Sequence, residues 1–137
     1  MNQTRVNHLA VIVGNLHDSM KLFASLFDCD PGDIIENDEL QIKLCIVRFE
    51  NISIELIQPT SEKSSFYDEL MNRTGVHHLS FEVASLSESI EKAKRNHMAL
   101  QSEIPLINHE GDQLIFADSK DLHVRLEFKK MVSEAST

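Results

Sequence analysis

The sequence predicts an α+β fold in which one strand-and-helix unit occurs twice. When the chain is shifted along itself by 70 residues (78 minus 8), His8 falls on His78 and Leu16 falls on Leu86. The agreement runs without a gap from a strand-like segment into a helix-like segment. The chain has 137 residues and 42% hydrophobic content, the size of one ordinary domain. Since half of it cannot bury a sheet face alone, the two copies are expected to pack together.

Each copy is expected to begin with a strand that leads into a helix. The strands are VNHLAVIV, Val6–Val13, and GVHHLSFEV, Gly75–Val83. Each is followed by a residue that caps helices and, three positions later, by an acid: Asn15 with Asp18, and Ser85 with Glu88. The helices that follow each carry one apolar stripe, namely Leu16, Met20, Phe23 and Phe27 in the first, and Leu86, Ile90 and Ala93 in the second.

Behind each helix the pattern becomes that of antiparallel strands. The expected strands are Leu40–Phe49 and Ile52–Ile57 in the first copy, and Gln113–Ala117, His123–Phe128 and a weaker one at Ile104–Ile107 in the second. A short helix is expected in SSFYDELMNR, Ser64–Arg73, between the copies. We therefore expect one domain over residues 1–137, made of a module at 5–57, a module at 76–128 and a linker at 58–75.

Charge and composition exclude several classes of protein. A formal net charge of -9 with scattered Lys and Arg argues against nucleic-acid binding, which needs a basic face. No apolar run approaches the roughly 18 residues that a membrane span requires. Cys29 and Cys45 form no C-x-x-C motif, and no apolar leader with a cleavage site is evident. A cytoplasmic protein with free thiols that acts on a small molecule is expected.

Strand alternation places one His and one Glu of each copy on the face that looks away from the helices. In the first strands, Leu9, Val11 and Val13 form the helix-facing set, which leaves His8 on the other face, and His78 is its equivalent. In the last strands the same reasoning selects Glu55 and Glu127, which correspond at an offset of 72 (127 minus 55). His77 falls on the helix side and is expected to be a packed residue.

The symmetric set suggests a metal site. A single His or Glu on a strand is usually an ordinary surface residue. Two carboxylates that converge with two imidazoles, however, need a cation to offset their burial. Two nitrogens and two carboxylate oxygens suit an octahedral first-row divalent ion with two positions open for water or substrate. Cobalt, nickel, manganese and zinc are all consistent with this ligand set.

VNHLAVIV, IELIQPTSEKSSFYDEL and GVHHLSFEV together resemble the vicinal oxygen chelate superfamily over about Arg5–Phe128. Within it, the chain is most similar to the methylmalonyl-CoA epimerases. The resemblance implies two βαβββ modules around a glyoxalase-like metal cleft, and a homodimer. It also implies His8, Glu55, His78 and Glu127 as metal ligands, with Glu55 or Glu127 as the base that removes a proton next to the carbonyl of an acyl-CoA thioester.

The resemblance leaves other functions open. A glyoxalase I-type lactoylglutathione lyase has a similar ligand set, and antibiotic-binding members of the superfamily use the same scaffold without catalysis. An extradiol dioxygenase is disfavoured, because it has no ligand at the Glu55 position. Lys43 falls near a position where related epimerases carry a glutamate, and it is interpreted as a contact for a substrate carboxylate or phosphate. The segment 117–123 lacks the glycine pair of the epimerases, which bears on the thioester assignment.

Overall fold

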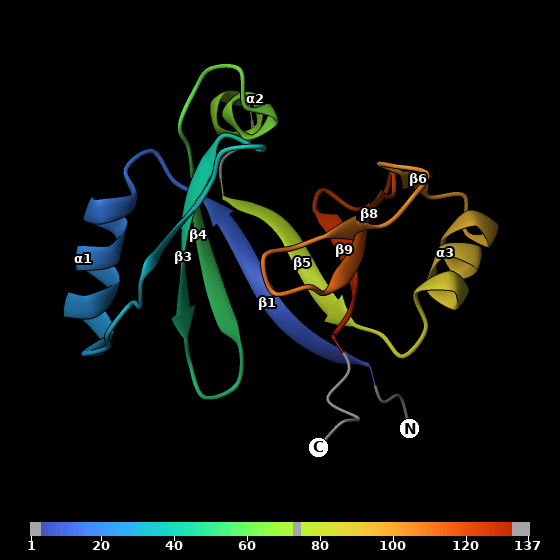
Figure 1. Cartoon of the computed structure of the whole chain (residues 1–137), viewed down its shortest axis with the longest axis horizontal. Coiled ribbons are helices and arrows are strands. Elements are labelled where there is room, and N and C mark those ends of the chain that lie inside the picture. Colours follow the sequence, from blue (N-terminus) through green and yellow to red (C-terminus); the bar gives the residue numbers. More distant parts are fainter. Residues whose placement is uncertain (1–3, 73–74, 133–137) are drawn as a thin grey trace. The chain divides into compact units, whose positions relative to one another are not determined.

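The computed structural model describes residues 4–72 and 75–132, and within them it confirms the α+β class with three helices and nine strands. The chain forms two compact units, one of residues 8–77 and one of residues 1–7 with 78–137. Figure 1 shows the strands and helices of each unit. No helix in the described part of the chain has the length and apolar character needed to cross a membrane.

The unit of residues 8–77 is a four-stranded sheet with two helices. Its elements, in chain order, are β1 (Arg5–Ile12), α1 (Leu16–Phe27), β2 (Ile34–Asn37), β3 (Ile42–Arg48), β4 (Ser53–Pro59) and α2 (Ser65–Asn72). The strand order is β2-β3-β4-β1, with β1 parallel to β4 and the other neighbours antiparallel. The predicted short helix between the copies is confirmed as α2.

Each face of this sheet has its own apolar cluster. On the face that α1 covers, Leu16 packs with Cys45, Val47 and Leu56, and with the half-buried Val11. The opposite cluster is made of Ala10, Ile12, Ile42, Leu44 and Ile57, together with Phe66 from α2. Because alternate residues of a strand point to opposite faces, the second set shares its face with His8 and Glu55.

The second unit repeats this topology. Its elements are β5 (Val76–Glu82), α3 (Leu86–Arg95), β6 (Ala99–Leu100), β7 (Leu106–Ile107), β8 (Gln113–Asp118) and β9 (Arg125–Lys130). β5 pairs in parallel with β9, as β1 does with β4, and β9 pairs antiparallel with β8, which also pairs with β6 and β7. Two modules, each of one strand, one helix and three or more further strands, are therefore present, as the internal repeat predicts.

Both predicted helix caps are present. The Asn15 side chain accepts a hydrogen bond from the backbone N–H of Asp18 at 2.9 Å. The Ser85 hydroxyl accepts one from the backbone N–H of Glu88 at 3.2 Å. Each cap satisfies an N–H at a position where the helix offers it no internal partner, which explains why both helices begin one residue later.

Three details differ from the sequence predictions. β2 and β6 were not expected, because strands of four and two residues are too short to show alternation. The last predicted strand begins at Arg125 rather than at His123. Phe27, expected in the core, is 54% exposed. Its ring instead contacts Phe49 edge-on, with ring centroids 5.5 Å apart, at the border of the sheet.

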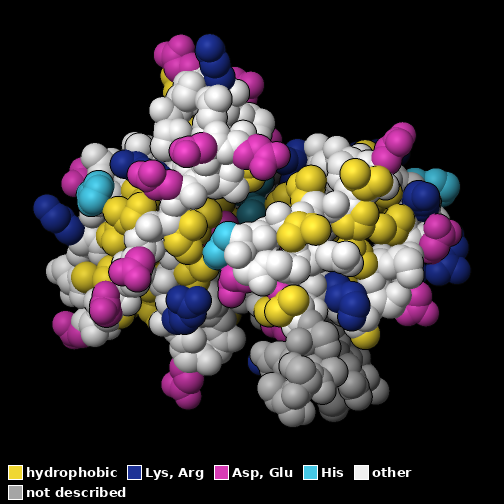
Figure 2. All heavy atoms as spheres, viewed as in Figure 1, with side chains coloured by type: hydrophobic (Ala, Val, Ile, Leu, Met, Phe, Trp, Pro, Cys, Tyr) yellow, Lys and Arg dark blue, Asp and Glu magenta, His cyan; other side chains and the backbone are white. Residues whose placement is uncertain are grey.

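The surface is acidic and carries scattered apolar side chains. On the face shown in Figure 2, Lys and Arg are interspersed with Asp and Glu and form no continuous basic patch. Exposed large hydrophobic residues occur in both units, for example Leu22 and Leu26 on α1, Ile104 just before β7 and Ile107 in β7. On this face the described basic residues do not gather into a surface that would match the phosphate backbone of a nucleic acid.

Candidate metal centre

In the unit of residues 8–77, parallel pairing of β1 and β4 brings His8 close to Glu55. The register sets Ala10 opposite Glu55 and His8 opposite Ser53. The Nε2 atom of His8 lies 3.4 Å from Oε2 of Glu55. His8 is buried, and the Glu55 side chain is 17% exposed. This His and this Glu were both predicted from alternation alone, and the structure places them together.

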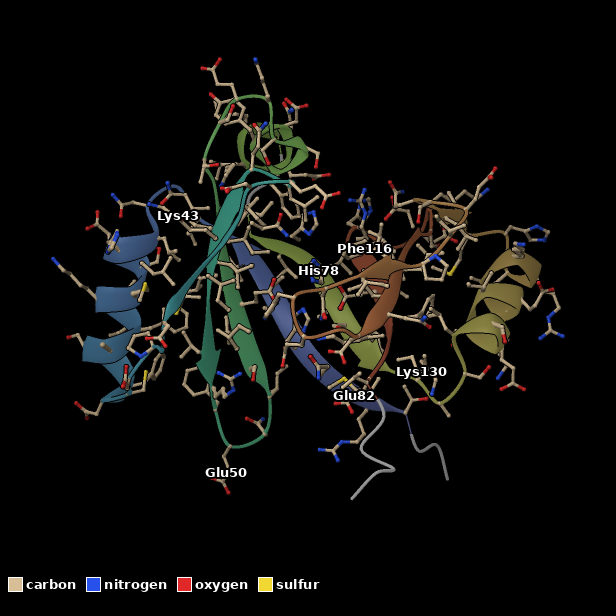
Figure 3. The ribbon with its side chains drawn as sticks, in the orientation of Figure 1. Lys43, Glu50, His78, Glu82, Phe116 and Lys130 are labelled. Carbon is tan, nitrogen blue, oxygen red and sulfur yellow. The ribbon has the colours of Figure 1, made fainter. Side chains whose placement is uncertain are left out.

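In the second unit, parallel pairing of β5 and β9 brings His78 close to Glu127. The Nε2 atom of His78 lies 3.7 Å from Oε2 of Glu127, and their side chains are only 3% and 5% exposed. The edge of the Phe116 ring packs on His78, with ring centroids 5.1 Å apart (Figure 3). This pair corresponds in strand position to His8 and Glu55, as the repeat predicts.

Glu127 has a polar environment that the sequence analysis missed. Ser80, fully buried and opposite Glu127 in the strand register, donates a hydrogen bond of 2.5 Å from Oγ to Oε1 of Glu127. Burial raises the pKa of Glu127, while the Ser80 hydrogen bond and the charge of Lys129 oppose that shift and Asp112 adds to it. Loss of hydration disfavours the charged carboxylate, and the hydroxyl and the ammonium group favour it. Glu127 is therefore a carboxylate whose charge is only partly compensated.

Both pairs suit a divalent metal ion. Ligand atoms about 2.0 to 2.2 Å from an ion stand about 2.8 to 3.1 Å apart at right angles and about 4.0 to 4.4 Å apart when opposite. The distances of 3.4 Å and 3.7 Å lie between these two separations, so small side-chain movements would bring both atoms of a pair onto one ion. An ion would also supply the positive charge that the buried Glu127 needs. The residues present therefore fit a first-row divalent metal.

The structure does not bring Lys43 to this face. Lys43 lies opposite Gln58 in the strand register, and the Gln58 side chain accepts a hydrogen bond from the backbone N–H of Leu16, at the start of α1. Alternation therefore puts Lys43 on the α1 side of the sheet (Figure 3), together with Cys45. The β3 residues that share a face with Glu55 are instead the apolar Ile42, Leu44 and Ile46, followed by Arg48 at the end of the strand.

A cationic side chain not selected from the sequence stands beside the second pair. Arg125 lies opposite His78 in the register of β5 and β9 and two residues before Glu127, so all three share one face. Asp118 orients it through two hydrogen bonds, of 3.0 Å from Nε and 3.1 Å from Nη2. Alternation along the last strand already predicts that Arg125 shares the face of Glu127, and the strand register adds that it lies opposite His78.

His77 is a packed residue, in agreement with the sequence analysis. It is 5% exposed, and its ring lies 4.8 Å, centroid to centroid, from the ring of Phe66 in α2. His77 and His78 are consecutive residues of β5, and alternation along a strand points consecutive side chains to opposite faces.

Comparison with known proteins establishes the family. The family model of the Glyoxalase/Bleomycin resistance protein/Dioxygenase superfamily matches residues 7–117. The chain belongs to this superfamily, which confirms the resemblance seen in its sequence motifs.

Among individual proteins, the chain is similar to methylmalonyl-CoA epimerases. It is 27% identical over 130 residues to the mitochondrial methylmalonyl-CoA epimerase of Dictyostelium discoideum, covering 91% of this chain and 78% of that protein. It is 24% identical over 119 residues to the mitochondrial methylmalonyl-CoA epimerase of Mus musculus, covering 85% and 67%.

Solved structures share the fold. A hypothetical protein from Bacillus halodurans C-125 has a TM-score of 0.88 at 21% identity, covering 99% of this chain and 100% of that chain. A methylmalonyl-CoA epimerase in complex with methylmalonyl-CoA and NH4+ has a TM-score of 0.85 at 18% identity, covering 96% and 97%. At these identities the structural likeness establishes the fold.

Proposed function

We propose that the chain is a metal-dependent epimerase that removes and returns the proton next to the carbonyl of methylmalonyl-CoA or a similar acyl-CoA thioester. The observation that carries this proposal is the occurrence of one buried His–Glu pair at equivalent strand positions of both modules. His8, Glu55, His78 and Glu127 together bind one divalent ion in this proposal. Similarity to epimerases along most of the chain supports the reaction class.

The chemistry divides between the ion and the carboxylates. The ion, when bound, supplies Lewis-acid stabilisation of the negative charge that develops on the carbonyl oxygen during proton removal. In the epimerase, one of the two glutamates takes the proton from one face of the α carbon and the other returns a proton to the opposite face, which inverts that carbon. In the metal-free protein burial raises the pKa of Glu127 above its ordinary value of 4.5, and a bound cation would oppose that shift, so Glu127 would act as a base when its carboxylate is released from the ion.

Arg125 supplies a positive charge for an anionic substrate group. Its guanidinium plane is oriented by Asp118 and lies on the face of His78 and Glu127. A planar guanidinium is the side chain best suited to a carboxylate. A substrate with a carboxylate near its thioester, such as methylmalonyl-CoA, matches this placement.

A one-base isomerase of the glyoxalase I type is the second candidate. The specific observation in its favour is that β3 presents Ile42, Leu44, Ile46 and, at its end, Arg48 on the face of Glu55, and none of these is a carboxylate or an imidazole. That strand therefore contributes no further acid or base there. A reaction that moves a proton between neighbouring carbons on one side of the substrate needs a single base.

The remaining features of the proposal come from the sequence analysis, and among them only the homodimer comes from the family resemblance. They are a single domain over residues 1–137, a homodimer, a cytoplasmic location, and cobalt, nickel, manganese or zinc as the ion. The similar curated epimerases are mitochondrial proteins. Cell fractionation and size-exclusion chromatography with light scattering test the location and the oligomeric state.

The first experiment is elemental analysis of protein purified without chelators, with His78→Ala and Glu127→Ala as test variants and His77→Ala as the matched control. We expect about one ion per chain in the unaltered protein, loss of it in both test variants, and its retention in the control, since His77 packs on Phe66. Deuterium exchange at the α carbon of methylmalonyl-CoA then tests the epimerase, and a hemithioacetal tests the glyoxalase. A purified protein that holds no metal and binds none when it is added would contradict both.

A further inference from the structure

We propose that Ser80 is a positioning residue that makes Glu127 a ligand through one oxygen, Oε2. This inference rests on the proposed metal site and concerns a side chain that was not among the predicted ligands. Ser80 and Glu127 stand opposite each other on β5 and β9, 47 residues apart in sequence. Their contact is therefore a product of strand pairing.

The two oxygens of Glu127 have different partners. Oε1 accepts the 2.5 Å hydrogen bond from the Ser80 hydroxyl, whereas Oε2 is the oxygen that lies 3.7 Å from Nε2 of His78. A hydrogen bond this short to a carboxylate is among the stronger ones in proteins. Turning the carboxylate so that both oxygens reach an ion would break it. The Ser80 bond thus favours coordination by Oε2 alone.

Burial makes this hydroxyl hard to replace. Ser80 is fully buried and Glu127 is 4% exposed. Water therefore has little access to Oε1 if the hydroxyl is removed, and the carboxylate must either lose a hydrogen bond or turn toward the ion. A serine hydroxyl also has only one side-chain torsion to order, so it holds Oε1 at a small entropic cost.

The first module lacks the equivalent hydroxyl. Ala10 occupies the position opposite Glu55 that Ser80 occupies opposite Glu127. Alanine has no group that donates a hydrogen bond from its side chain. The two modules therefore differ at this register position. Ser80 on β5 orients the carboxylate of Glu127 by a hydrogen bond, whereas Ala10 on β1 has no side-chain group that could do the same for Glu55.

The test compares Ser80→Ala with Ser80→Thr, which keeps the hydroxyl, and with Ser64→Ala as a matched control. Ser64 is also buried, and its hydroxyl donates to the carbonyl of Leu40 at 2.8 Å, within the other unit. The probe is Co²⁺. Its affinity is measured by competition with a chelator, and its visible spectrum reports the number and type of ligands.

We expect Ser80→Ala to weaken Co²⁺ binding about 10- to 100-fold, as is typical when a partner of a metal ligand is removed, and to change the spectrum. Ser80→Thr should restore both properties, and Ser64→Ala should leave both unchanged. Unaltered affinity and an unaltered spectrum in Ser80→Ala would overturn the role of Ser80 alone. If the unaltered protein binds no Co²⁺, the proposed metal site fails and the inference fails with it.

Discussion

Replacing Glu127 by glutamine should stabilise the metal-free protein and abolish its stabilisation by metal. Glu127 is 4% exposed, and burial raises its pKa. Folding therefore favours the protonated form of Glu127 more than the unfolded chain does, and ionisation of this carboxyl group lowers the stability of the folded state. This penalty is absent below the ordinary value of 4.5 and grows as pH rises through the higher pKa of the folded protein. A neutral glutamine removes the penalty and also removes a ligand.

The expected change in Tm can be calculated from the free energy by which a bound metal stabilises the folded protein. A ligand present at about 100 times its Kd stabilises the folded state by about 2.7 kcal/mol. At about 2.1 cal/mol/K per residue, the entropy of unfolding is about 0.29 kcal/mol/K for a chain of 137 residues. Metal should therefore raise the Tm of the unaltered protein by roughly 9 °C. The Glu127→Gln variant should show almost none of this rise.

The assay is thermal unfolding at several pH values, with EDTA or with added Co²⁺. Glu82→Gln is the matched control, because Glu82 lies on the same face of the neighbouring β5 and its carboxylate accepts a hydrogen bond from Asn7 at 3.1 Å. This control should keep the full metal-dependent rise in Tm. The reasoning is refuted if Glu127→Gln lowers the Tm of the metal-free protein at neutral pH, or if it keeps the full rise with Co²⁺.

Three further predictions follow from individual contacts. Asn15→Ala and Ser85→Ala should each lower the free energy of unfolding by about 1 kcal/mol, measured by urea denaturation, because each removes a helix cap; unchanged midpoints would argue against the caps. Lys43→Met should leave KM for methylmalonyl-CoA within about twofold, because Lys43 lies on the α1 side of its sheet; a large rise in KM would contradict that placement. Lys129→Met should cost about 3 to 5 kcal/mol, because it leaves the buried Asp112 without the ammonium group 3.7 Å away; a smaller loss than for the caps would show that this ion pair contributes little.

The sequence was informative where a feature is local. Helix caps depend on residues three positions apart, so Asn15 and Ser85 were identified correctly. The faces of β1 and β4 were also assigned correctly, because in these strands polar residues alternate with apolar ones. Because of the internal repeat, the same alternation of polar and apolar residues occurs in both halves of the chain. Together they selected two His–Glu pairs that the structure places within 3.7 Å or less.

The direction of the Lys43 side chain could not be predicted from the sequence. In β3, Ile42, Leu44, Cys45, Ile46 and Val47 are apolar on both faces of the strand, so alternation does not say which way Lys43 points. Only pairing with β4, which sets Lys43 opposite Gln58, decides the face. A strand that is buried on both sides carries no directional signal in its sequence.

By itself, the sequence determined the α+β class, the duplication, the family and the residues of each His–Glu pair, since these depend on periodicity and motif. The tertiary structure alone decided that Ser80 holds one oxygen of Glu127, that Asp118 orients Arg125, and that Asp112 meets Lys129. The first two contacts join residues on different strands, and the third joins β9 to the loop before the neighbouring strand β8. Their distances depend on strand register and side-chain packing, which a pattern of residue types along one chain does not specify.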